Sequence, residues 1–205
     1  MPELICLGAG GHAKACQHII EDAGYTIRGY LDPRQDRNNL NGIPVLGDDK
    51  EISYWVDKCC NFFITVGQPR NPNLRRMLFL RVYKYDSVEF PTFISLWSSA
   101  DSTASIGAGT IVMDAAHVGP DVYIGQQSII NTGAIVEHDC KIGSFTHLCV
   151  GTTIAGGTYI GSGCTIGANA VIREGLIIPD NLLIPMGAVV TNQGDVEYFK
   201  EKAKR

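Results

Sequence analysis

The second half of this sequence repeats with a period of six residues, and no other feature constrains the fold as strongly. From about residue 94 onward, an aliphatic residue returns at every sixth position without an insertion. The fifteen positions in this phase are Ile106, Val112, Val118, Ile124, Ile130, Val136, Ile142, Leu148, Ile154, Ile160, Ile166, Ile172, Ile178, Ile184 and Val190. Such a repeat is typical of a solenoid, because each unit forms one side of a coil and stacked coils bury one continuous core. We therefore expect a solenoid of β-strands.

The other positions of the repeat indicate a triangular coil. A small residue usually stands two positions before the aliphatic residue, as at Ala134, Cys140 and Thr146. Glycine often follows the aliphatic residue directly, and we interpret it as the backbone freedom that a corner needs. This glycine occurs at positions 107, 119, 125, 143, 161 and 167. With three sides to a coil, residues 106–195 predict about five coils, stacked about 4.8 Å apart.

The first half has a different pattern, in which short apolar runs alternate with helical periods. We predict strands over 4–8, 27–31 and 62–66, and helices over 12–23, 50–58 and 73–83. This alternation favours an α/β domain with a parallel sheet and crossover helices. The expected organisation is a Rossmann-like domain over 1–92, a β-helix over 93–195 and a C-terminal tail over 196–205, for which a helix and disorder both stay open.

Composition excludes several classes of function. The chain has 17 basic and 21 acidic residues, a formal charge of -4 and no basic run, which argues against a nucleic-acid partner. Its seven cysteines have no metal-binding or disulfide spacing, so we expect reduced thiols in a cytoplasmic protein and no metal site. A basic leader segment and a long apolar run are both missing, so we expect no membrane segment.

A glycine-rich loop lies at the start of the first domain. Gly8, Gly10 and Gly11 follow a predicted strand and open a predicted helix, where backbone amides and the positive helix end can hold a diphosphate. A dinucleotide oxidoreductase would share this loop, but the repeats begin where the second half of its sheet should continue. Asp32, after the second strand, is expected either to bind ribose or base hydroxyls or to be an ordinary turn residue.

Motifs in both halves together resemble a known family. They are Leu7-Gly8-Ala9-Gly10-Gly11-His12-Ala13-Lys14, Tyr30-Leu31-Asp32, Thr65-Val66-Gly67, Asn131-Thr132-Gly133 and Glu137-His138-Asp139-Cys140-Lys141-Ile142-Gly143. In this order and spacing they resemble the bacterial sugar acetyltransferases of the sialic acid O-acetyltransferase and nucleotide-4-amino-sugar N-acetyltransferase family. The resemblance implies a left-handed β-helix, a homotrimer, a nucleotide-sugar site on the N-terminal domain and acetyl-coenzyme A bound along the β-helix between subunits.

His138 is the candidate general base for acyl transfer, because an imidazole that titrates near neutrality can take the proton of an attacking amine or hydroxyl. An 18-residue coil stacks it between Pro120 and Gly156, and we expect the missing side chain at Gly156 to leave room for substrate. Glu137 and Asp139 flank it, and the residues alone do not show which one orients the ring; the resemblance implies Asp139. The alternative is a polar corner residue with no catalytic role.

The resemblance implies further contacts. His147 would contact the thioester region of acetyl-coenzyme A, although it could be a surface ladder position between Ile129 and Thr165. Asn131 would contact the acceptor sugar or form an inward amide ladder. Positions that would contact the coenzyme are Gly156, Ala168 and Met186. On the first domain, Gly67 would let the backbone approach the nucleotide, and His12 would touch the acceptor sugar or simply begin the helix.

The expected function is N-acetylation of a nucleotide-linked 4-amino-4,6-dideoxy sugar, carried by UDP or dTDP, for bacterial surface glycans or glycoproteins. Cys140 and Cys149 are the candidate nucleophiles for an acyl-enzyme. We expect direct transfer instead, because Cys140 occupies an inward small position of the repeat. Two alternatives stay open: a sialic acid or sugar O-acetyltransferase, and a non-enzymatic solenoid that binds nucleotide sugars.

Overall fold

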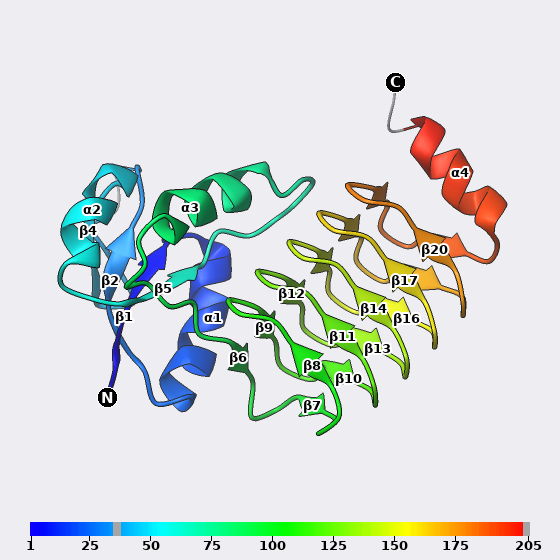
Figure 1. The fold of residues 1–205 in the computed structure, drawn as a ribbon, viewed down its shortest axis with the longest axis horizontal. Helices are drawn as coiled ribbons and strands as arrows, with labels where there is room; N and C mark the ends of the chain where they lie inside the picture. The colour runs from blue at the N-terminus through cyan, green and yellow to red at the C-terminus, as the bar shows by residue number, and fades with distance from the viewer. Residues whose placement is uncertain (35–37, 203–205) are drawn as a thin grey trace. The chain divides into compact units, whose positions relative to one another are not determined.

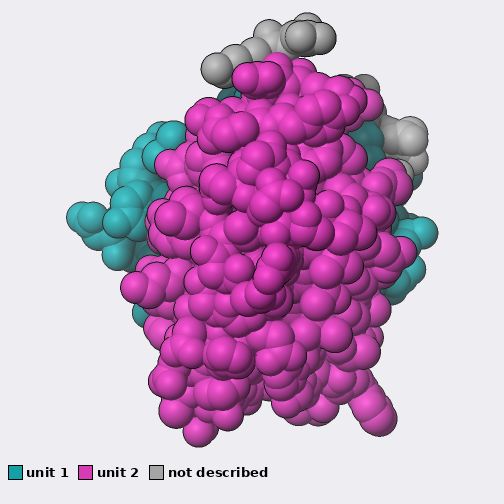
Figure 2. Space-filling model, turned by 90° about the vertical axis from the view of Figure 1, so that its right-hand side faces the viewer, with its two compact units in different colours: residues 1–67, 73–93 teal, residues 68–72, 94–205 magenta. Residues whose placement is uncertain are grey.

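A computed structural model describes residues 1–34 and 38–202 and divides the chain into two compact units. The first unit contains Met1–Gly67 and Asn73–Phe93, and the second contains Gln68–Pro72 and Ile94–Arg205. Figure 2 colours the two units separately. The short segment Gln68–Pro72 therefore packs with the repeats although it lies among first-unit residues in the sequence.

The first unit is built on a five-stranded sheet with the strand order β3-β4-β2-β1-β5. β1 lies between β2 and β5 and pairs in parallel with both, as the alternating pattern predicts. The strands are β1 (Glu3–Leu7), β2 (Thr26–Leu31), β3 (Asn39–Leu40), β4 (Ile43–Gly47) and β5 (Asn61–Ile64). The helices are α1 (Gly11–Asp22), the short 3-10 helix η1 (Asp49–Glu51), α2 (Ile52–Val56) and α3 (Asn73–Tyr83).

The antiparallel hairpin of β3 and β4 is absent from the sequence-based prediction. Its turn is Asn41-Gly42, and both residues have positive φ, 50° and 83°. An Asn-Gly pair between short strands is the characteristic signal of such a hairpin, because both central residues of the turn must adopt the left-handed conformation. The sequence therefore carried the information.

The second unit is a parallel β-helix of two-residue strands (Figure 1). Strands three apart in sequence pair in parallel with an 18-residue register, as at His117, Ile135 and Thr153. This arrangement forms three sheets, one for each side of the coil, and confirms the prediction of a left-handed β-helix.

The side that begins with β6 contains β6 (Phe93–Ile94), β9 (Ile111–Val112), β12 (Ile129–Ile130), β15 (His147–Leu148), β18 (Thr165–Ile166) and β21 (Leu183–Ile184). The next side contains β7 (Ser99–Ala100), β10 (His117–Val118), β13 (Ile135–Val136), β16 (Thr153–Ile154), β19 (Val171–Ile172) and β22 (Val189–Val190). The third side contains β8 (Ser105–Ile106), β11 (Tyr123–Ile124), β14 (Lys141–Ile142), β17 (Tyr159–Ile160) and β20 (Ile177–Ile178).

The aliphatic residues of the repeat form the core of this unit. All of them from Val112 to Val190 have no exposed surface, and Ile106, in the first full coil, is partly buried. Small hydroxyl residues beside them close the backbone at one corner: Thr110 donates to the Gly125 carbonyl at 2.8 Å, and its oxygen accepts the Ser128 amide at 3.0 Å. The polar small residues thus supply partners for buried backbone groups.

The glycines that follow the aliphatic residues have a different role from the one expected. None of them has a positive φ; that conformation occurs three residues after each aliphatic residue, at every sixth position from Gly109 to Gly187, in glycine and non-glycine residues alike. A Cβ added to Gly143 would lie 2.4 Å from the Ser162 amide nitrogen of the next coil, and one added to Gly167 would lie 2.3 Å from that of Met186. These glycines are needed because successive coils approach closely at the corners.

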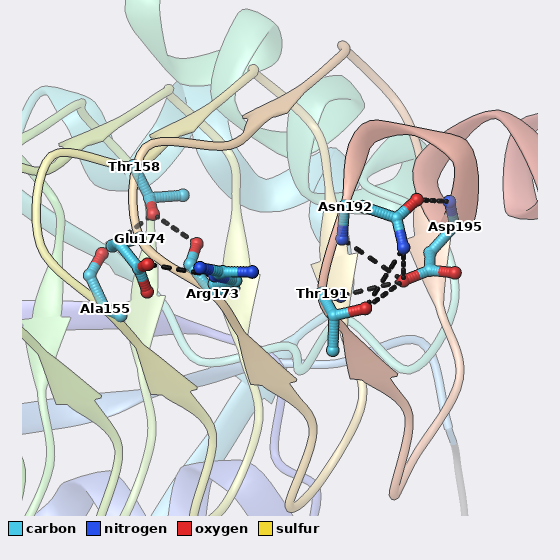
Figure 3. A network of polar contacts seen from close by, with 7 residues as sticks. All are labelled: Ala155, Thr158, Arg173, Glu174, Thr191, Asn192 and Asp195. Carbon is cyan, nitrogen blue, oxygen red and sulfur yellow. Dashed lines mark hydrogen bonds and ion pairs between the residues drawn. The ribbon is translucent and has the colours of Figure 1, made fainter.

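The C-terminal segment forms a helix, α4 (Gln193–Lys202), that closes the last coil (Figure 1). Val196 is fully buried against the aliphatic core, and Phe199 packs beside it. Figure 3 shows how Asp195 accepts hydrogen bonds from Thr191 and Asn192 at the start of this helix. The expectation for 196–205 is thus resolved as helix through Lys202, while 203–205 lie outside the described residues. Within the part described, no helix combines the length and apolar character needed to cross a bilayer.

Replacing a glycine that follows an aliphatic residue should destabilise the fold more than replacing a glycine with positive φ. We expect Gly143→Ala to lower the free energy of unfolding by about 3 kcal/mol or more, because the added methyl overlaps the backbone of the next coil. Gly133→Ala is the matched control: Gly133 has φ 66° and open space around it, so the left-handed conformation alone should cost about 1 kcal/mol. Urea unfolding of both variants measures the difference, and equal losses would contradict the packing explanation.

Candidate active site

The side chains of His138 and Asp139 contact each other on the exposed corner between β13 and β14. The imidazole Nδ1 lies 2.8 Å from Asp139 Oδ2, and the two side chains are 61% and 66% exposed. Asp139 occupies one of the turn positions with positive φ, here 60°. The turn therefore fixes the backbone from which the carboxylate meets the ring, and Nε2 remains the ring atom able to accept a proton.

The carboxylate raises the basicity of this histidine. The hydrogen bond to Asp139 is the main cause that raises the pKa of His138 above its usual 6.5; desolvation, the next largest effect, opposes it, and the charges of Asp139 and Glu137 act in the raising direction. The orienting hydrogen bond thus comes from Asp139, and half-buried Glu137 contributes through its charge. The raised pKa means that the neutral, basic form dominates only above that pKa.

Gly156 forms the floor under the imidazole. The expected stacking is present: Val136 pairs with Ile154, the Gly157 amide donates to the His138 carbonyl, and the Asp139 amide donates to the Pro120 carbonyl. A Cβ added to Gly156 would lie 2.6 Å from His138 Cε1 and 2.7 Å from Nε2. The missing side chain therefore makes room for the imidazole itself.

The nearby cysteines have environments that suppress nucleophilic reactivity. Cys140 is fully buried in the core, as expected, and its thiol donates to the Ala155 carbonyl at 3.2 Å. Burial raises the pKa of Cys140 and raises that of Cys149 to about 11. Because the thiolate is the nucleophilic form, neither residue is suited to form an acyl-enzyme at neutral pH.

His147 and Asn131 bind each other. His147 stacks between Ile129 and Thr165, but it is only 8% exposed, so the alternative of a surface ladder position is wrong. Its Nδ1 donates to the Gln68 carbonyl at 2.8 Å, and its Nε2 accepts from Asn131 Nδ2 at 3.0 Å. The Gln68 side chain in turn donates to the Phe145 carbonyl, which holds the segment 68–72 against this side of the coil.

The remaining residues expected to contact the coenzyme lie on two corners. Ala168 and Met186 are 18 residues apart and stack on one corner, where the Gly187 amide donates to the Ala168 carbonyl. Met186 is 79% exposed. Gly156 lies on the next corner, under His138. The three positions thus border the two ends of the side formed by β7, β10, β13, β16, β19 and β22.

In the first unit, the glycine-rich loop joins β1 to the start of α1. Gly8 has φ 106°, and a Cβ there would lie 2.5 Å from Val66 Cγ2, so only glycine fits. Gly10 precedes the helix, and Gly11 is its first residue. The first amides of a helix have no partners within it and carry positive partial charge. The loop therefore has the geometry of an anion site.

Asp32 is committed to the loop and to a neighbouring arginine. Its side chain is buried and accepts the Ala9 amide at 2.7 Å and Arg34 Nε at 2.7 Å. Burial alone would raise the pKa of this carboxyl, but the hydrogen bonds from Arg34 and Ala9 lower it to about 2. Asp32 is thus more than an ordinary turn residue, because its carboxylate holds the glycine-rich loop through the Ala9 amide. Arg34, which the sequence reasoning missed, is an exposed cation beside Gly10.

Gly67 and His12 lie close together at the end of β5. A Cβ on Gly67 would lie 3.5 Å from His12 Cβ, and His12 Nε2 is 3.5 Å from the Cys16 thiol. Arg75, also missed, is fully buried and donates to the carbonyls of Ile64 and Val66, while burial lowers its pKa to about 10. Nothing in its helical sequence pattern signals this role, because its partners lie on a strand.

Comparisons with known proteins match both units. Residues 3–82 match the PglD N-terminal domain, and residues 139–174 match the bacterial transferase hexapeptide model of six repeats. The acetyltransferase domain of PglB from Neisseria gonorrhoeae FA1090 is 27% identical with a TM-score of 0.86, over 93% of this chain and 92% of that one. The structure of the same domain in complex with acetyl coenzyme A is 27% identical with a TM-score of 0.84, over 93% of each chain.

A second similar structure is a histidine-to-alanine mutant of GDP-perosamine N-acetyltransferase from Caulobacter crescentus, in complex with CoA and GDP-perosamine. It is 26% identical with a TM-score of 0.75, over 90% of this chain and 94% of that one. The fold and these similarities define an acyltransferase of the hexapeptide-repeat class. Over nearly its whole length the chain is similar to bacterial sugar acetyltransferases, with a match to a PglD-type N-terminal domain followed by a match to such repeats.

The hydrogen bond to Asp139 makes a prediction that needs no substrate. We expect Asp139→Asn to lower the pKa of His138, because the variant removes both the charged acceptor and its field. Glu137→Gln is the matched control and should lower it less, since Glu137 acts through charge alone. NMR titration of the imidazole measures all three proteins, and a larger decrease for Glu137→Gln would refute the assignment of Asp139.

Proposed function

We propose that the protein transfers the acetyl group of acetyl-coenzyme A to the amino group of a nucleotide-linked 4-amino-4,6-dideoxy sugar. The observation that carries this proposal is the exposed His138–Asp139 pair, whose ring lies on a glycine floor in a chain similar to acetyl-coenzyme A-binding and amino-sugar-binding acetyltransferases. A buried histidine would have no access to an acceptor. The exposed one has its basic nitrogen available.

In the proposed reaction, the acceptor amine attacks the thioester carbonyl and a bond forms between nitrogen and carbon. His138 Nε2 removes the proton from that nitrogen, while Asp139 stabilises the charged ring through Nδ1. The carbon–sulfur bond then breaks and the coenzyme thiolate leaves, taking up a proton. Because the base must be neutral, kcat/KM should fall as the pH decreases through the raised pKa of His138.

The glycine-rich loop is proposed to hold the nucleotide diphosphate. Gly8, Gly10 and Gly11 place backbone amides at the positive end of α1, and Asp32 keeps the loop in that geometry through Ala9. Gly67 is proposed to let the backbone approach the ligand, and His12 to contact the acceptor sugar. Arg34 adds a cation beside the loop. With its carboxylate already occupied, Asp32 acts in this proposal by positioning the loop.

The β-helix is proposed to hold acetyl-coenzyme A between subunits of a homotrimer. Gly156, Ala168 and Met186 border one side of the coil, and the outward residues Val171 and Val189 of that side are 40% and 63% exposed, apolar surface that a neighbouring subunit could cover. We propose that His147 and Asn131 line the thioester end as a preformed pair. The free thiols throughout the described residues support a reducing, cytoplasmic environment.

The acceptor is best identified by thiol release from acetyl-coenzyme A with a panel of candidates. UDP- and dTDP-linked 4-amino sugars test the proposal directly, and a GDP-linked amino sugar belongs in the panel because a similar structure contains GDP-perosamine. Release with amino sugars and formation of an amide support the proposal. Transfer to free sialic acid, independent of any nucleotide, would instead identify an O-acetyltransferase.

Replacement of the base should separate the two possible mechanisms. We expect His138→Ala to reduce kcat by roughly 10²- to 10⁴-fold, the usual contribution of a general base. Cys140→Ala is the control, and it should retain transfer if the variant remains folded. Activity is measured by thiol release, and folding by the thermal midpoint. Loss of activity in a folded Cys140→Ala variant, together with activity in His138→Ala, would reject direct transfer.

The glycine floor gives a second test of the same ring. We expect Gly156→Ala to lower kcat roughly a hundredfold, because the new methyl overlaps the imidazole and displaces it from the acceptor. The neighbouring Gly157→Ala is a matched control, since a Cβ at Gly157 has nothing within 4 Å. Steady-state kinetics on both variants checks the result. If both lose activity equally, strain of the corner and not the position of His138 would be the cause.

A further inference from the structure

The β-helix is poor in positive charge. Between residues 94 and 192 there are only two basic residues, Lys141 and Arg173, against seven acidic ones: Asp101, Asp114, Asp121, Glu137, Asp139, Glu174 and Asp180. A ligand with several phosphate groups would therefore meet a surface that repels it, except near these two cations. Coenzyme A carries a diphosphate and a further phosphate on its ribose, so its placement on the coils is restricted; the other described basic residues of the second unit, Arg70, Lys200 and Lys202, lie outside the coils.

Both cations border the corner that contains His138. Lys141 lies three residues after His138, in the same coil, on β14. Arg173 follows β19 two coils further along, where its backbone position stacks over Ala155 and Glu137 through an 18-residue register. Two coils correspond to about 10 Å along the axis of the β-helix. The column of His138 and Gly156 continues to Glu174, and Arg173 stands in the neighbouring column, two coils from the imidazole along the axis.

The surface between His138 and Arg173 carries no bulky side chain. The intervening corner is Ala155-Gly156-Gly157, so nothing larger than a methyl group projects from it, and the His138 ring covers Gly156 from one end. The pantetheine arm of the coenzyme is equivalent to roughly three or four residues of extended chain, or about 10–14 Å. An arm that begins with its thioester at His138 can therefore span this corner and end near Arg173.

The guanidinium of Arg173 is exposed and oriented. Its side chain is 59% exposed, and its Nε donates to Glu174 Oε1 at 2.9 Å, as Figure 3 shows. An arginine has five N–H donors in a planar arrangement, so the hydrogen bond from Nε leaves the donors of the two terminal nitrogens to bind a phosphate. The Arg173 carbonyl accepts the Thr158 hydroxyl, which fixes the backbone that carries the side chain.

We propose that Arg173 is a positioning residue that anchors a phosphate group of acetyl-coenzyme A, two coils from His138. This inference rests on the proposed function and adds a specificity contact to it. Arg173 selects the phosphorylated coenzyme over shorter thioesters and sets the length of the arm that reaches the imidazole. It takes no part in bond formation, so its contribution belongs to coenzyme affinity.

The test compares Arg173→Gln with Lys141→Gln, which removes the same charge from the coil of His138. We expect Arg173→Gln to raise the KM for acetyl-coenzyme A and the Kd for coenzyme A about tenfold, with kcat unchanged, because a charge-assisted bond is lost. Lys141→Gln should leave both within about twofold. With acetyl-pantetheine, which has no ribose or diphosphate, wild type and Arg173→Gln should have equal kcat/KM.

The 3'-dephospho form of coenzyme A distinguishes the phosphate concerned. If the rise in Kd caused by Arg173→Gln disappears with this ligand, Arg173 binds the ribose phosphate. If the rise persists, Arg173 binds the diphosphate. Either result supports the proposal. Unchanged coenzyme affinity in Arg173→Gln, an equal loss with acetyl-pantetheine, or weakened nucleotide-sugar binding instead would overturn it. If wild type itself binds no coenzyme A by calorimetry, the proposed function fails as well.

Discussion

Every functional position on the second unit depends on the 18-residue coil, because the aliphatic residues that fill its interior decide which side chains stack on the outside. The core from Val112 to Val190 is fully buried, and no insertion interrupts it. One extra residue between His138 and Gly156 would move the glycine off the corner and place another side chain under the imidazole. The repeat therefore specifies the site as strictly as it specifies the fold.

The sequence predicted the β-helix well, since a solenoid is nearly one-dimensional and its contacts are separated by a fixed interval. It predicted the roles of individual residues less well. The glycines after the aliphatic residues suggested turns, but their purpose is the close approach of the next coil, which the period alone does not reveal. The hairpin at Asn41-Gly42 had a recognisable local signal; the partners of Asp32 and His147, 23 and 79 residues away, had none.

The choice between Glu137 and Asp139 shows why local sequence was insufficient. Both are adjacent to His138, and both carry the same charge. Only Asp139 occupies the turn position with positive φ, from which its short side chain meets Nδ1. The repeat assigns that conformation to every sixth residue, so the phase of the coil, and not the identity of the carboxylate, decides which neighbour bonds to the imidazole.

In the coil, the inward positions determine stability and the outward corner positions carry the residues of the candidate site. Inward positions tolerate only aliphatic or small residues, whereas the outward positions on the corner of His138 contribute little to the core and differ from coil to coil. On the corner of His138, successive coils present an imidazole, a bare glycine and an arginine–glutamate pair. Because these three coils pack with the same backbone geometry, a column of unlike side chains can match the successive parts of a long ligand without any change in the fold.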